Sequence, residues 1–155
     1  MFDFINPTIA ALRELIPYLS EKSKTENITK RLVLRELRDN LKVLIYAYEK
    51  KADVDKVIDR LNNAAIKEAV KTGFDFNKIC KGKITEQLIT EERNKKYIGW
   101  SCEQLFDKVD EKIEELRLIK NLYPNLDESR KNMTLVIGNL YFRMKLLADF
   151  IRAGK

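Results

Sequence analysis

The sequence predicts an all-α protein: an antiparallel bundle of four long helices, with a shorter N-terminal helix and an irregular segment around residues 73–100. Five glycines and three prolines in 155 residues are few, whereas a β-sandwich or barrel needs frequent turn residues. Apolar residues recur at steps of three and four over long stretches, which is the helical period. A hydrophobic share of 45% is enough for one core, so we expect residues 1–155 to form a single helical domain.

The N-terminal helix has a start signal in Asn6 and Pro7. Asparagine caps free backbone N–H groups, and proline is tolerated at the first helical position. We expect Pro17 to kink or end this helix, because proline lacks a backbone donor and clashes with the preceding turn. The residues that follow the start at helical spacing are Ile9, Leu12, Ile16 and Leu19.

A second helix is predicted over residues 28–51, and a third over residues 54–72. The second carries a heptad pattern of apolar residues: Leu34, Leu37, Leu41, Leu44 and Tyr48. Asp53 is a plausible cap between the two helices, and Gly73 is a typical terminator of the third. One continuous helix across residues 50–55 is the alternative.

The segment FDFNKICKGK (74–83) shows no clear period, and residues 84–89 have the composition of a short helix. Ser101 and Gln104 have the spacing of a capping box. The fourth helix is therefore predicted to start there, with a start near Thr90 as the alternative, and to end at Tyr123 before Pro124. Its apolar pattern consists of Cys102, Phe106, Val109, Ile113 and Leu116.

The fifth helix is expected to start near Asp127 and to run almost to the end of the chain. Residues 133–151 are apolar around most of the helix, as in a helix surrounded by others. Arg143, Lys145 and Asp149 interrupt this window. Charges at mid-bilayer are costly, so we predict a buried bundle helix rather than a membrane span.

Two stripes of charge run along the second and fourth helices with the same steps of four, three and four. Each covers about 60° of arc. The basic stripe suggests a phosphate-binding face, whereas pairing between the stripes of neighbouring antiparallel helices is the structural alternative. The basic stripe is Arg31, Arg35, Arg38 and Lys42, and the acidic stripe is Glu103, Asp107, Asp110 and Glu114.

The composition excludes several chemistries. The chain has no histidine, which removes Ser-His-Asp and Cys-His catalysis, His-ligated zinc, and the Glu-x-x-His pairs of di-iron bundles. Cys80 and Cys102 are too few for a four-cysteine metal site, and a reduced pair is expected. The usual P-loop and dinucleotide signatures are absent. We therefore expect no catalytic residue, no metal and no cofactor, and no small-molecule site is evident.

The stretch TEERNKKYIGW (90–100) resembles the start of the HEPN family motif, in which an arginine and a polar residue are followed by a histidine on a helix of a small α-bundle. Arg93 and Asn94 match the start. The family's histidine would fall at Ile98, Gly99 or Trp100, and none of these is a histidine. The resemblance thus implies a HEPN-like bundle without nuclease activity. Tyr97, Ile98 and Trp100 are expected to pack this segment onto the bundle.

We expect a non-catalytic helical interaction module that binds a protein partner or itself, either as a homo-oligomer or as a subunit of a complex. Helical bundles commonly present an apolar seam to a partner helix. The N-terminus has no signal-peptide pattern, so a cytoplasmic location is expected.

Nucleic-acid binding is the alternative function, because the net charge is +6 and the pI is about 9.2. Its candidate residues are the basic stripe together with Lys81, Lys83, Arg93, Lys95 and Lys96. An enzymatic role would depend on the polar residues around Arg93 alone.

Overall fold

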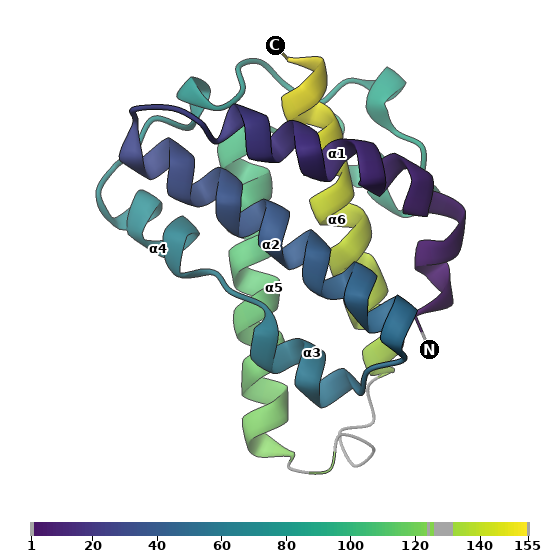
Figure 1. Ribbon diagram of the computed structural model, residues 1–155. Helices are drawn as coiled ribbons and strands as arrows, with labels where there is room; N and C mark the ends of the chain where they lie inside the picture. Colours follow the sequence, from purple (N-terminus) through teal and green to yellow (C-terminus); the bar gives the residue numbers. More distant parts are fainter. Residues whose placement is uncertain (1, 124, 126–131, 155) are drawn as a thin grey trace.

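The computed structural model describes residues 2–123, 125 and 132–154, and it is all-α, with no strand in these ranges (Figure 1). Short 3-10 helices precede α1 and occupy the segment before α5. The prediction of an all-α fold is confirmed. The α-helices are α1 (Ile9–Lys22), α2 (Ile28–Lys50), α3 (Val54–Arg60), α4 (Ala64–Lys71), α5 (Cys102–Leu122) and α6 (Met133–Ala153).

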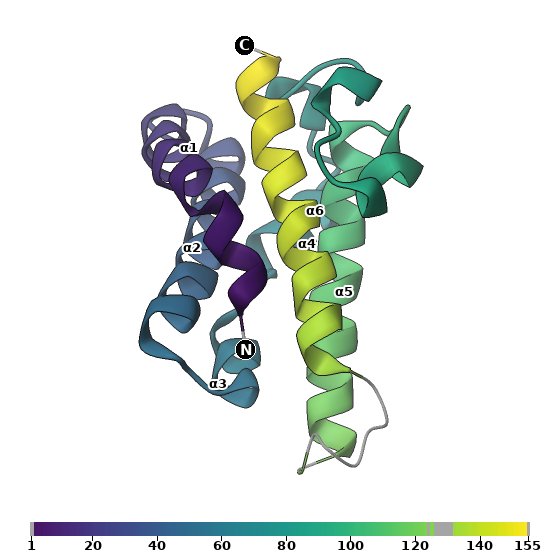
Figure 2. The same cartoon turned by 90° about the vertical axis from the view of Figure 1, so that its right-hand side faces the viewer.

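The long helices form two packed pairs rather than one bundle of parallel axes. α1 packs on α2 and α5 packs on α6, while α6 also contacts both α1 and α2. The α1–α2 pair runs obliquely across the α5–α6 pair (Figures 1 and 2). The core fills the space between the two pairs, so α6 is buried along most of its length.

The first turns differ from the expected start. A 3-10 helix, Asp3–Thr8, precedes α1, so Asn6 is not its cap. The Asn6 side chain instead accepts a hydrogen bond from the Tyr48 hydroxyl at 2.8 Å. Pro17 was expected to kink or end the helix; it lies inside α1, which continues to Lys22, so the helix does not end there. Burial of leucines on both sides of the proline, Leu15 and Leu19, favours continuation of the helix despite the missing donor.

The second predicted helix is confirmed, and the third is wrong in one respect. α2 ends where Lys51 takes a left-handed conformation, with φ of 52°, so the chain turns and no continuous helix crosses residues 50–55. The predicted helix 54–72 is divided into α3 and α4 by an extended Leu61 and two asparagines. Gly73, with φ of 71°, follows α4 as expected of a helix terminator.

The segment before α5 is irregular, as predicted. Its 3-10 helices are Phe76–Lys78, Glu86–Leu88 and Glu92–Tyr97, so only the middle of the short helix expected over 84–89 forms. An isolated bridge joins Lys83 to Ser101. The Ser101 and Gln104 side chains form the predicted capping box, and α5 therefore starts at Cys102 rather than near Thr90.

α6 begins at Met133, where the Asn132 side chain accepts a hydrogen bond from the Leu135 amide. The expected start near Asp127 lies outside the described residues. Arg143 and Lys145 are buried on α6. The Arg143 Nε donates to the Tyr97 hydroxyl at 2.6 Å, and its guanidinium lies over the same ring. No helix in the described part of the chain is both long and apolar enough to cross a membrane.

Lys51 is the one non-glycine residue at positive φ in the described ranges, and it forms the corner between α2 and α3. A side chain with a Cβ is disfavoured in this conformation, whereas glycine is not. We expect Lys51→Gly to raise the free energy of unfolding by up to about 1 kcal/mol. Lys50→Gly, one residue earlier and inside α2, should lower it by about 1 kcal/mol. Urea titration of the two variants measures both effects, and a change of the same sign in both would contradict the left-handed corner.

Candidate functional site

The two charge stripes do not face each other. α3 and α4 contact both α2 and α5 and lie between them (Figure 2). No ion pair joins the stripes within the described ranges. The structural alternative, direct pairing of α2 with α5, is therefore wrong. Sequence periodicity reports which residues share a helix face, but it does not report which helix covers that face.

The basic stripe faces solvent in part. Arg35 and Lys42 are exposed, and Arg31 is partly buried; none of the three has an ion-pair partner among the described residues. Arg38 is partly buried, and its guanidinium binds the Asp39 carboxylate and the Ser20 hydroxyl. Most of the stripe is thus available to an external anion.

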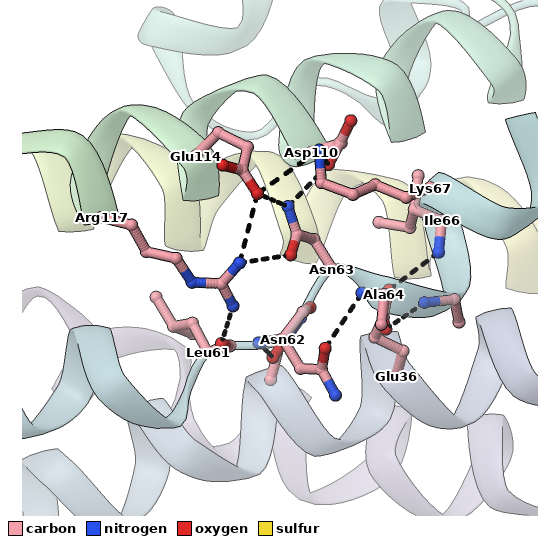
Figure 3. A network of polar contacts seen from close by, with 12 residues as sticks. Glu36, Leu61, Asn62, Asn63, Ala64, Ile66, Lys67, Asp110, Glu114 and Arg117 are labelled. Atoms are coloured by element: carbon pink, nitrogen blue, oxygen red, sulfur yellow. Dashed lines mark hydrogen bonds and ion pairs between the residues drawn. The ribbon is translucent and has the colours of Figure 1, made fainter. Parts of the chain in front are cut away.

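Two members of the acidic stripe, Asp110 and Glu114, bind the break between α3 and α4 instead (Figure 3), whereas Glu103 and Asp107 are exposed. The Asn63 side-chain amide donates to Asp110 at 2.7 Å and to Glu114 at 2.8 Å. Lys67 on α4 lies 3.5 Å from Asp110 and 3.4 Å from Glu114. Arg117, one turn along α5, donates to the side-chain oxygen Oδ1 of Asn63 and to the backbone carbonyl of Leu61. α5 thereby satisfies the polar groups that the break leaves without helical partners.

α2 holds the same break from the opposite side. The Asn40 side chain exchanges two hydrogen bonds with the Asn62 backbone, at 2.8 and 2.9 Å. The Glu36 carboxylate accepts from the amides of Ala65 and Ile66, at 2.7 and 3.1 Å (Figure 3). These amides belong to the first turn of α4 and have no intrahelical acceptor, so a distant residue caps this helix. The orientation of α3 and α4 is therefore set jointly by α2 and α5.

The two carboxylates of this network have opposite pKa shifts. Burial raises the pKa of the Glu36 carboxyl above its ordinary value, although the Ala65 and Ile66 amides oppose the change. The hydrogen bond from Asn63, followed by the contacts with Lys67, lowers the pKa of Glu114. Desolvation disfavours a charged carboxylate, whereas donors and cations favour it.

A groove opens where α2, the Lys51 corner and α3 meet. It has a volume of about 370 Å³, and almost all of its exposed wall is apolar. Its floor comes from Val43, Tyr46 and Ala47 of α2, Ala52 of the corner, and Val57 of α3. Tyr46 is 59% exposed and lines this apolar hollow.

Three cations surround this apolar groove: Lys50, Lys56 and Arg60. All are exposed, and none forms an ion pair within the described ranges. Lys50 and Arg60 lie in the last turns of their helices, where a cation also interacts favourably with the helix dipole. The helix dipole does not explain the position of Lys56, because Lys56 lies near the start of α3.

The groove adjoins the exposed part of the basic stripe. Lys42, Tyr46 and Lys50 follow one another at four-residue steps on α2 and so share a face. Arg35 lies on this face two turns before Lys42. Unpaired positive charge therefore extends along α2 to the apolar groove.

The remaining predicted basic residues have two different roles. They are Lys81, Lys83, Arg93, Lys95 and Lys96. Arg93 stacks over the Phe142 ring at 4.5 Å and donates to the Asn139 side chain. Its Nε also pairs with Glu91 at 3.3 Å. Asn94 is buried and donates to the Phe142 carbonyl at 3.1 Å. The two residues that carry the resemblance to the HEPN motif thus attach their segment to α6.

The lysines of this group are exposed. Lys95 pairs with Glu92, and Lys96 lies over the Tyr97 ring. Lys81 and Lys83 have no ion-pair partner among the described residues. Tyr97 is buried and Trp100 partly so, as the packing prediction required, but Ile98 is 42% exposed.

The described residues contain no group of three potential metal ligands from His, Cys, Asp and Glu. Both cysteines are free and buried, and burial raises the pKa of each thiol, which disfavours the reactive thiolate. No protein-family model, curated protein or solved structure matches the chain.

Sequence reasoning missed the residues that build the groove and its support. From the sequence, Glu36 and Asn40 would be assigned to the solvent-exposed polar face of their helix, yet both are buried. One available signal was the Asn62–Asn63 pair, since asparagines favour turns over helix interiors. Lys50, Lys56 and Arg60 have no distinguishing pattern in the sequence.

The opposite pKa shifts predict opposite pH dependence. Glu36 has a raised pKa, so the folded state binds its proton more tightly, and its contribution to stability falls as pH rises through the folded pKa. Glu114 has a lowered pKa, so its contribution is present above the ordinary value and is lost as pH falls through the folded pKa. We expect the stability of wild type relative to Glu36→Gln to decrease between about pH 4 and 7.

The matched variant Glu114→Gln should show the opposite slope at lower pH: the stability of wild type relative to this variant should fall as pH drops below the ordinary glutamate value of about 4.3, because the pKa of Glu114 is lowered. Urea unfolding at several pH values gives both slopes. Parallel slopes for the two variants would contradict the burial of Glu36 against α4.

Proposed function

We propose that the protein is a non-catalytic interaction module that binds an acidic amphipathic helix of a partner protein in the groove between α2 and α3. The observation that carries this proposal is an apolar groove surrounded by three cations, Lys50, Lys56 and Arg60, without ion-pair partners in the described ranges. An amphipathic helix binds such a groove through apolar residues at i, i+3, i+4 and i+7.

The charges select the partner. Carboxylates beside the apolar anchors of the partner helix would meet the three cations and the exposed end of the basic stripe. Complementary charge accelerates association and disfavours basic competitors. The apolar floor around Tyr46, Ala47 and Val57 supplies the area whose burial favours binding.

The groove is held in a form that suits docking. Polar contacts from α2 and α5 fix the break that positions α3, and Lys120 of α5 also pairs with Asp59 of α3. A preformed site loses less conformational entropy on binding than a flexible one. This rigidity favours a recognition surface that accepts a partner without rearrangement.

Nucleic-acid binding is the second candidate, and the exposure of unpaired Arg35 and Lys42 favours it. Phosphate contacts need cations but no apolar floor. The two candidates therefore differ in which part of the α2 surface they require.

A synthetic helical peptide with leucines at i, i+3, i+4 and i+7 and glutamates beside them tests the first candidate. Fluorescence anisotropy should show saturable binding to the wild-type protein. Lys56→Glu with Arg60→Glu should weaken binding about tenfold or more, because each reversal replaces attraction by repulsion at the groove. A peptide with lysines in place of the glutamates should not bind.

The matched control is Lys71→Glu with Lys78→Glu, which makes the same change in net charge at exposed positions away from the groove. It should bind the acidic peptide as the wild type does. Equal weakening by both double variants, or no saturable binding to the wild type, contradicts the docking groove. Binding of labelled RNA or DNA at low salt, lost in Arg35→Glu with Lys42→Glu, would support the second candidate instead.

A further inference from the structure

A second cavity, which is broadly open to solvent, lies on another part of the molecule, between α1, the segment 87–90 and the C-terminal half of α6. Its volume is about 640 Å³, within the roughly 300–1,000 Å³ range of small-molecule sites. Its lining is about as polar as it is apolar, unlike that of the α2–α3 groove. The polar lining comes from Gln87 and Thr90 of the segment, and from Lys145, Asp149 and Arg152 of α6.

Lys145 and Asp149 form a mostly buried ion pair that opens onto this cavity. Their side chains are 11% and 17% exposed, and Nζ lies 2.9 Å from the Asp149 Oδ2. A buried ion pair is rarely more stabilising than apolar side chains of similar volume. Two apolar side chains at these positions would therefore pack α6 equally well. Packing alone does not explain why a lysine and an aspartate are buried here.

The pair leaves hydrogen-bonding capacity unused. An ammonium has three N–H donors, and Lys145 spends one of them on Asp149. The remaining donors have no acceptor among the described residues. Arg152 stands at the same cavity one turn beyond Asp149, and its only ion pair in the described ranges is a 3.7 Å contact with Glu14, whose side chain is 76% exposed.

We propose that this cavity is a binding site for a small organic anion that carries both a carboxylate or phosphate group and a hydrogen-bond donor. Lys145 and Arg152 bind the anionic oxygens, and Asp149 orients the Lys145 ammonium and accepts the ligand's donor. Gln87 and Thr90 offer further hydrogen bonds from the facing wall. Charge-assisted hydrogen bonds of this kind are the strong ones in protein sites. The site is separate from the α2–α3 groove and does not depend on its function.

The test uses the full chain, with inorganic phosphate and lactate as separate probes at constant ionic strength. Both probes carry anionic oxygens and an O–H donor, and they distinguish a phosphate ligand from a hydroxycarboxylate. In ¹H–¹⁵N NMR titrations, at least one probe should produce saturable shifts at the amides of Thr90, Lys145 and Arg152. Arg152→Gln should weaken that binding about tenfold, through loss of one charge-assisted contact.

Lys145→Met with Asp149→Leu should abolish the binding and keep the fold, because both members of the buried pair are replaced by apolar groups. Lys71→Glu with Lys78→Glu lowers the net charge at exposed positions that do not line this cavity and should leave the titration unchanged. No saturable shifts with either probe overturns the proposal. Shifts that persist unchanged in Arg152→Gln also overturn it, and this exposed substitution provides that test even where the double variant fails to fold.

Discussion

The break between α3 and α4 is the constraint on which the arrangement of this protein depends. Three residues, 61–63, leave the helical conformation between two packed helix pairs, where their backbone groups need partners. Asn40 from α2 and Arg117 from α5 supply those partners. Because both helices bind the same short segment, the break acts as a joint that fixes the distance between them.

This joint explains why the groove and the charge stripes lie where they do. With the break fixed, α3 turns back beside the C-terminal end of α2, and the apolar residues of the two helices leave a hollow between them. Asp110 and Glu114 of α5 are occupied by Asn63 and Lys67, and no ion pair in the described ranges joins a carboxylate of α5 to a cation of α2. An excess of positive charge therefore remains on the α2–α3 surface, and the functional proposal depends on it.

Individual elements show which structural features local sequence patterns predict and which they do not. The capping box at Ser101 set the start of α5 correctly because its two hydrogen bonds are formed within four residues. The local preferences of Pro17 and Asn6 did not predict the end and the start of α1. Burial of the α1 leucines outweighed the effect of Pro17, and the Asn6 side chain binds the distant Tyr48 hydroxyl instead of capping the helix. Arg93 and Asn94 were predicted as possible site residues, whereas their contacts with α6 give them a packing role. The groove cations had no local signal at all.

The sequence by itself determined the helical class, the extent of α2, the start of α5 and the irregular segment before it, because period and capping act over a few residues. Only the tertiary structure decided which helix faces which. The two charge stripes have matching spacing, yet α3 and α4 lie between them. The break is likewise stabilised by residues more than 20 positions away in the chain. Contacts of that kind are formed between helix faces, and no pattern within one helix specifies its partner.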